Sequence, residues 1–133
     1  MKYRKKKIYA ILLVVLFSGC LSDTSTWDRV DADTFNQEII DNKSAFILDV
    51  RTLSEWNDDG YIDNATLIPH NELENNEENL PEDKDDLILL YCRSGNRSEN
   101  AAQTLIDMGY NNIIELKTGI NGWKSGGYSV IYP

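Results

Sequence analysis

One cysteine follows the most apolar stretch of residues 27–133 and is accompanied by two arginines. Cys92 comes directly after residues 87–91, and Arg93 and Arg97 lie one and five positions further along. A thiol reacts as its thiolate, which nearby cations and backbone amides stabilise. These residue types predict a nucleophilic sulfur that accepts an anionic group. The alternative is a buried structural thiol at a strand end, since free cysteines are often buried.

The segment after Cys92 predicts a tight loop that leads into a helix. Gly95 and Asn96 tolerate a left-handed backbone, and residues 97–108 have helical apolar spacing that ends at Gly109. Such a loop directs backbone N–H groups inward, and the following helix adds its positive end. Because ligands bind beyond the carboxyl ends of parallel strands, the loop after residues 87–91 is the candidate site.

The rest of the domain alternates between strand-like and helix-like stretches. Asp31 can cap a helix, and the acidic segment 71–86 predicts an exposed stretch with a short helical turn at its start. Short apolar runs predict strands at residues 45–50, 66–69, 87–91 and 112–116. Strands that alternate with helices predict an α/β domain with a central parallel sheet and helices on both faces.

Residues 92–98, Cys-Arg-Ser-Gly-Asn-Arg-Ser, resemble the active loop of single-domain rhodaneses. Three further segments resemble that family in the same order: residues 49–56, with Asp49-Val50-Arg51 and Glu55-Trp56, residues 60–65, and residues 118–123. Trp56, Tyr61 and Asn64 depart from the family's usual residues, but none of them lies in the active loop. The resemblance implies the rhodanese-like fold and a sulfurtransferase that carries a persulfide on Cys92, with an active loop of Arg93, Ser94, Gly95, Asn96 and Arg97.

Loop length separates two chemistries in proteins of this kind. Four residues lie between Cys92 and Arg97, whereas cysteine phosphatases have five, and their larger ring surrounds a phosphate. The resemblance therefore favours transfer of sulfane sulfur from a donor such as thiosulfate to a nucleophilic acceptor. The alternative is a non-catalytic persulfide carrier or a redox-sensing binding module, which needs the same loop.

Each charged residue near the loop has an expected role. We expect Arg93 to contact thiosulfate and Arg97 to shape the loop while adding positive charge. Arg51 and Glu55 have the spacing of an ion pair within a helix.

Asp49 could tune the charge of the site or pair with an arginine, and pairing is the expected role. Trp123 is expected to form an apolar wall near the site. His70 is the only histidine, and one histidine with one free cysteine cannot build a metal site. No metal and no cofactor are expected.

The first residues have the organisation of a lipoprotein signal peptide. Five basic residues precede an apolar run of ten, which is too short to span a bilayer, and Ser18-Gly19-Cys20 follows. Phe17 to Cys20 resembles a lipobox, so we expect cleavage after residue 19, lipid on Cys20 and a tether over residues 20–26. The globular domain is then residues 27–133, anchored outside the cytoplasm in the cell envelope. The alternative is ordinary cleavage near Gly19 that leaves Cys20 as a free thiol.

The charge of the chain limits its partners. Removal of residues 1–19 takes five of the 13 Lys and Arg and none of the 22 Asp and Glu, which changes the net charge from −9 to −14. An acidic surface repels nucleic acid and anionic lipid headgroups. The expected partners are small sulfur-containing anions, thiol acceptors and, through the lipid alone, a membrane. We expect a monomer.

Overall fold

A parallel sheet runs through the centre of the molecule, which is known from a computed structural model that describes residues 27–133. The sheet has five strands in the order β1-β5-β4-β2-β3, and each neighbouring pair is parallel. This arrangement confirms the predicted α/β class. The strands are β1 (Asp28–Val30), β2 (Phe46–Asp49), β3 (Thr66–Leu67), β4 (Ile88–Tyr91) and β5 (Ile113–Leu116).

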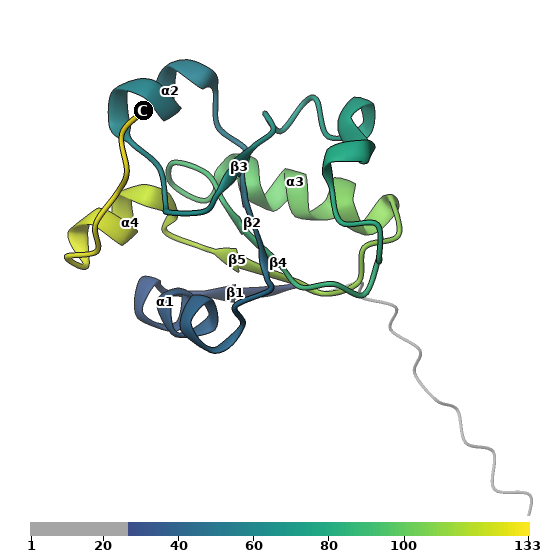
Figure 1. Cartoon of the computed structure of the whole chain (residues 1–133), viewed down its shortest axis with the longest axis horizontal. Coiled ribbons are helices and arrows are strands. Elements are labelled where there is room, and N and C mark those ends of the chain that lie inside the picture. The colour runs from purple at the N-terminus through teal and green to yellow at the C-terminus, as the bar shows by residue number, and fades with distance from the viewer. Residues whose placement is uncertain (1–26) are drawn as a thin grey trace, which may run out of the picture.

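Helices cover both faces of this sheet, as predicted. Figure 1 shows α1 on one side of the strands and α3 on the other. Asp31 caps α1 by accepting a hydrogen bond from the backbone N–H of Thr34, which confirms the predicted helix start. The helical elements are α1 (Ala32–Asp41), α2 (Leu53–Asp59), the 3₁₀ helix η1 (Glu74–Asn79), α3 (Asn96–Asp107) and α4 (Gly119–Ser125).

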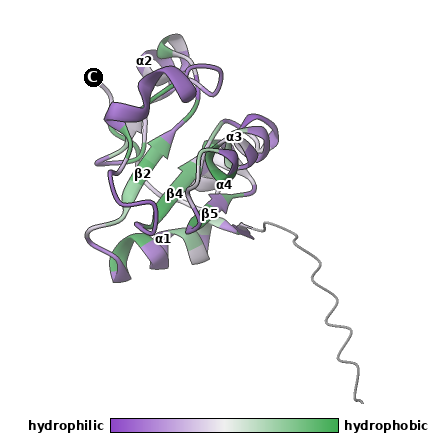
Figure 2. Ribbon diagram, turned by 90° about the vertical axis from the view of Figure 1, so that its right-hand side faces the viewer, coloured by the Kyte–Doolittle hydropathy of each residue, from purple (hydrophilic) through white to green (hydrophobic). Residues whose placement is uncertain are grey.

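The central strand β4 is buried along its whole length, and its side chains alternate between two apolar clusters. Ile88 and Leu90 pack into the cluster that contains residues of α3, and Cys92 continues that row. Leu89 and Tyr91 point to the opposite cluster, which contains residues of α1 and α4. Figure 2 shows hydrophobic colour along β2 and β4 and hydrophilic colour on α2 and on outward parts of the helices. The two-residue period of β4 therefore places Cys92 on the α3 side of the sheet.

Three elements depart from the sequence predictions: β1 and α4 were not predicted, and α2 begins at Leu53, after the Arg51 that was expected to lie within that helix. β1 is an edge strand of three residues, and α2 buries none of its seven residues, so neither has a long apolar pattern. α2 begins with a capping box between Thr52 and Glu55, a spacing that the sequence does display. The third element, α4, has seven residues and begins at a glycine.

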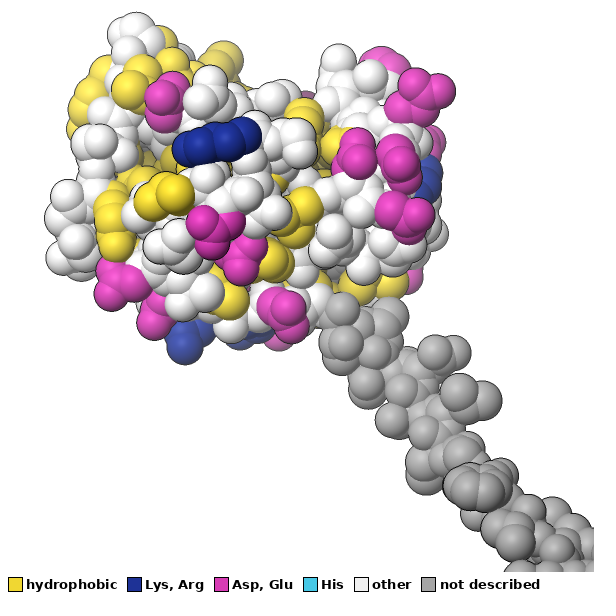
Figure 3. Space-filling view, turned by 60° about the horizontal axis from the view of Figure 1, so that its bottom comes forward, with side chains coloured by type: hydrophobic (Ala, Val, Ile, Leu, Met, Phe, Trp, Pro, Cys, Tyr) yellow, Lys and Arg dark blue, Asp and Glu magenta, His cyan; other side chains and the backbone are white. Residues whose placement is uncertain are grey.

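The predicted signal peptide and tether, residues 1–19 and 20–26, lie outside the described residues. Within residues 27–133, no helix combines the length and the apolar character needed to cross a membrane. Figure 3 shows acidic side chains spread over the face that comes forward there, with fewer basic ones between them.

Candidate active site

Cys92 lies at the carboxyl end of β4, at the bottom of a tight loop. Its side chain is 1% exposed, and its sulfur accepts a hydrogen bond from the backbone N–H of Gly95 at 3.1 Å. Gly95 has a φ of +103°, and a Cβ there would lie 2.1 Å from the carbonyl oxygen of Lys117. Glycine is therefore required at this position both by conformation and by space. The sequence also allowed a left-handed backbone at Asn96, but of the two residues only Gly95 adopts one. Asn96 is already the first residue of α3.

The amino end of α4 holds the loop from the other side. The N–H groups of Ile120 and Asn121 donate to the carbonyl oxygens of Cys92 and Arg93 at 2.9 and 3.1 Å. Gly119 makes this approach possible, since a Cβ on it would lie 2.3 Å from the carbonyl carbon and oxygen of Arg93. The loop is thus closed by backbone contacts with α4.

Arg97 joins the end of the loop to α2. Its guanidinium forms two hydrogen bonds with the carboxylate of Glu55 in α2, at 2.7 and 2.6 Å. These bonds hold the pKa of Glu55 at about 2, well below its usual range. The positive charge of Arg97 is therefore matched by a carboxylate and is not free for an anion in the loop.

The predicted ion pair between Arg51 and Glu55 is wrong, because α2 begins only at Leu53. Arg51 instead pairs with Asp49 at 2.7 Å, and its guanidinium also donates to the carbonyl oxygen of Gly60 at 2.6 Å. Both side chains of the pair are fully buried. Asp49 thus has the arginine partner expected of it, and its carboxylate lies at the end of β2 beside the site strand.

The prediction that Trp123 forms an apolar wall near Cys92 is wrong. Trp123 packs edge-on against Phe35, with ring centroids 6.2 Å apart, and its indole N–H donates to the carbonyl oxygen of Ser129. These contacts belong to the cluster on the face opposite to Cys92. The tryptophan stabilises α4 against α1 and reaches the loop only through α4.

A polar network behind Cys92 was missed in the sequence. The sulfur lies 3.3 Å from the hydroxyl oxygen of Ser98, and that hydroxyl lies 2.6 Å from a carboxylate oxygen of Glu115. Both Ser98 and Glu115 are completely buried. Arg29 and Trp27 donate to the same carboxylate at 2.9 and 2.7 Å. The sequence did contain one indication of this network. Glu115 is an acidic residue inside the apolar run 113–116, and a buried carboxylate needs hydrogen-bond or ionic partners.

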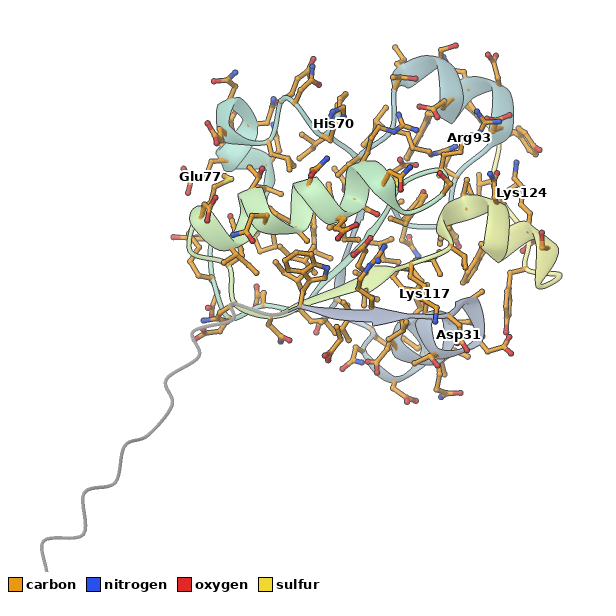
Figure 4. All side chains as sticks on the ribbon, turned by 180° about the vertical axis from the view of Figure 1, so that it is seen from behind. Asp31, His70, Glu77, Arg93, Lys117 and Lys124 are labelled. Carbon is orange, nitrogen blue, oxygen red and sulfur yellow. The ribbon has the colours of Figure 1, made fainter. Side chains whose placement is uncertain are left out.

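Arg93 and Ser94 are exposed at the mouth of the loop. Figure 4 shows Arg93 on the side of the molecule where α2 and α4 approach each other. Among the described residues, Arg93 is the arginine that takes part in no salt bridge. Its charge is therefore available to an anion that approaches Cys92.

The arrangement can hold a small anionic group on sulfur but offers no metal centre within residues 27–133, where no three His, Cys, Asp or Glu side chains converge. The N-terminus of α3 carries no side-chain cap, so its first amides are not occupied by a capping side chain. Together with the Gly95 N–H they favour negative charge beside Cys92.

Comparison with known proteins agrees with this geometry. The family described as "Rhodanese-like domain" matches residues 31–126. A protein of Allochromatium vinosum named "Sulfurtransferase" is 29% identical over 106 residues, which cover 80% of this chain and 96% of that protein. The "Putative sulfur carrier protein YrkF" of Bacillus subtilis is 32% identical over 101 residues, 76% of this chain and only 53% of that protein.

A solved structure supports the fold independently. The crystal structure of a rhodanese-related protein from Thermoplasma volcanium superposes with a TM-score of 0.69 at 31% identity and covers 80% of this chain and 100% of that one. The family match spans most of residues 27–133, including the cysteine loop. This chain belongs to the family of rhodanese-like domains.

Proposed function

We propose that this protein is a sulfurtransferase that carries sulfane sulfur as a persulfide on Cys92, with thiosulfate as one donor. The observation that carries the proposal is the buried Cys92 sulfur at the bottom of the loop, which accepts a hydrogen bond from the Gly95 N–H. The next residue, Arg93, is exposed and takes part in no salt bridge among the described residues. The Cys92 sulfur would attack the outer sulfur of thiosulfate, and sulfite would leave with the electron pair of the broken S–S bond. A nucleophilic acceptor would then take the terminal sulfur and restore the thiolate.

The same loop argues against phosphoester hydrolysis. Only four residues separate Cys92 from Arg97, and the Arg97 guanidinium is turned to Glu55. A phosphate would lack the arginine fork that stabilises its charge. We therefore expect turnover of phosphotyrosine or an aryl phosphate to remain at background.

The test is the intact mass of the purified protein after incubation with thiosulfate. We expect the addition of one sulfur atom, its removal by cyanide, and neither change in Cys92→Ser. Ser98→Ala serves as a control that alters the surroundings of the sulfur but keeps the thiol. An adduct that persists in Cys92→Ser would place the chemistry elsewhere and reject the proposal.

A sulfur-carrier role is the second candidate, favoured by the likeness to the Bacillus subtilis protein. A carrier would form the same persulfide but would turn over slowly with small acceptors. Steady-state production of thiocyanate from thiosulfate and cyanide separates the two roles. Multiple turnovers per Cys92 indicate the enzyme, whereas a single stoichiometric release indicates the carrier.

We also propose that the protein is lipid-anchored through Cys20 in the cell envelope. The support is the basic start, the ten-residue apolar run and the small residues before Cys20. With Cys20 lipidated, Cys92 would be the only thiol left in the chain. A lone thiol outside the cytoplasm would make control of its reactivity important.

A further inference from the structure

The buried carboxylate of Glu115 is the unexplained feature of the site. Charged groups are rarely placed in a protein interior unless they are paired, because desolvation costs several kcal/mol. Glu115 is fully buried in β5, one hydroxyl away from the Cys92 sulfur. Its carboxylate accepts hydrogen bonds from Trp27 and Arg29, which join β1 to β5, and from the Ser98 hydroxyl beside the sulfur. Its partners therefore indicate what it does.

The hydrogen bonds around Ser98 have one consistent direction. A carboxylate only accepts, and Ser98 has a single hydroxyl hydrogen, so the 2.6 Å contact requires Ser98 to donate to Glu115. The hydroxyl oxygen can then only accept from Cys92, whose sulfur lies 3.3 Å away. This arrangement fits the protonated thiol. A thiolate would need the Ser98 hydroxyl to turn away from Glu115 and donate to sulfur.

We propose that Glu115 is a positioning residue that acts through Ser98 to keep Cys92 protonated at rest, and so sets the pH at which it becomes a nucleophile. The inference rests on the proposed role of Cys92 and deepens it. Glu115 competes with the thiolate for one hydroxyl hydrogen and adds a negative charge behind the sulfur.

Other charges around Cys92 have identifiable effects. Arg29, on β1, opposes Glu115 by donating to its carboxylate, and it also donates to the carbonyl oxygen of Gly95 at 3.2 Å. Arg97, on α3, is matched by Glu55 of α2, while Arg93 faces solvent at the loop mouth. Of these charged groups, Glu115 is the one whose carboxylate is linked to the Cys92 sulfur by hydrogen bonds through a side chain, the hydroxyl of Ser98.

The experiment measures the thiol directly rather than sulfur transfer. The full chain with Cys20→Ser leaves Cys92 as the only thiol, and its alkylation by iodoacetamide, in which thiolate sulfur displaces iodide, is followed by mass from about pH 6 to about pH 10. Glu115→Gln keeps the shape of the side chain, but its amide N–H can donate to Ser98 and turn that hydroxyl toward sulfur. We expect the midpoint of the pH–rate profile to fall by about one pH unit.

Two further variants test whether the effect of Glu115 reaches Cys92 through the Ser98 hydroxyl. In a Ser98→Ala background the effect of Glu115→Gln should shrink to less than half, because the hydroxyl that transmits it is gone. Glu99→Gln is the matched control, since the exposed carboxylate of Glu99 also faces Arg29, at 3.9 Å, whereas the hydrogen-bond partners of the Ser98 hydroxyl are Cys92 and Glu115. It should leave the midpoint unchanged.

Arg29→Gln gives a second test with the opposite sign, which holds even if Glu115→Gln folds poorly. It leaves the Glu115 charge unbalanced and should move the midpoint to higher pH. The inference is rejected if Glu115→Gln leaves the midpoint unchanged or raises it, if Glu99→Gln moves it equally, or if the shift survives Ser98→Ala in full. Failure of persulfide formation from thiosulfate would reject the proposed function and leave this result standing.

Discussion

Buried polar side chains gather around the carboxyl ends of the strands and decide which charges remain free. Within residues 27–133 the fully buried polar or charged side chains are Asp49, Arg51, Ser98 and Glu115. Each charged one has an ionic partner, as burial requires. Since Arg97 is also paired, Arg93 is left as the loop cation that can meet a substrate.

Arg93→Ala should therefore weaken the use of anionic donors selectively. Loss of a charge-assisted contact worth about 1.5–3 kcal/mol should lower kcat/KM for thiosulfate by about tenfold or more. A neutral persulfide donor should be affected much less, because it has no charge for Arg93 to contact. Steady-state rates with both donors test this, with Lys43→Ala as a control at an exposed cation in the turn between α1 and β2. Equal losses for the two donors would contradict the role of Arg93.

At the scale of elements, the loop is held by α2 and α4, whose bounds were not predicted from the sequence. α2 reaches it through the Glu55 and Arg97 pair, whose side chains are 19% and 28% exposed. α4 reaches it through backbone N–H groups and Gly119. Glu55 of α2 and Gly119 of α4 lie outside residues 92–98, so each attachment can be changed without replacing a residue of the loop.

Glu55→Gln should lower stability in a pH-dependent way. The pKa of Glu55 is depressed from its ordinary value of 4.5 to about 2 by Arg97, so the carboxylate stabilises the folded state above about pH 4.5. That contribution is lost as the pH falls from about 4.5 to about 2. We expect a loss of about 1–2 kcal/mol at neutral pH and little difference from wild type at the acid limit. Urea unfolding at several pH values measures this, with Glu74→Gln in η1 as the exposed control.

Gly119→Ala should damage the site far more than Gly127→Ala. Both glycines have positive φ, +61° and +85°, so each alanine costs about 1–2 kcal/mol of backbone strain. Only at Gly119 does the added Cβ collide with the backbone of Arg93, whereas nothing lies within 4 Å of the position at Gly127. Persulfide yield on the folded protein should collapse in the first variant and survive in the second. Equal yields would show that α4 does not shape the loop.

At the scale of the whole molecule, the parallel sheet brings the ends of β2, β4 and β5 to one edge. Asp49, Cys92 and the Lys117 carbonyl meet there although they are far apart in the chain. The described domain begins at Trp27, which itself donates to Glu115. The predicted tether therefore joins the domain next to the network behind the site.

Membrane attachment is the prediction that belongs to the complete chain. Expressed in a bacterium that processes lipoproteins, the wild type should fractionate with membranes, while Cys20→Ser should carry no lipid. The reason is that no helix of residues 27–133 could itself span the bilayer, so attachment would depend on the modified cysteine. Intact mass of both forms gives the readout, and unlipidated wild-type protein from such a host would reject the anchor.

The sequence by itself determined the fold class, the longer elements and the position of the candidate cysteine loop. Apolar runs and a helical period are visible in the sequence alone, so β2, β4, β5 and α3 were predicted within a residue or two of their ends, and α1 at its start. The loop could be located because Cys92, Gly95 and the arginines are adjacent in the chain. Short elements such as β1 and α2 carry too few apolar residues to be recognised this way.

Only the tertiary structure decided how the charges pair. The spacing of Arg51 and Glu55 suggested a local pair, but each found a different partner: Asp49 for Arg51, and Arg97, 42 positions away, for Glu55. Glu115 meets Arg29 across 86 positions. Such pairs depend on which strands lie side by side, and the parallel order β1-β5-β4 is a property of the assembled sheet. The chain alone thus indicates the candidate nucleophile, Cys92, while the polar contacts around its sulfur, with Ser98 and through it Glu115, exist only after folding.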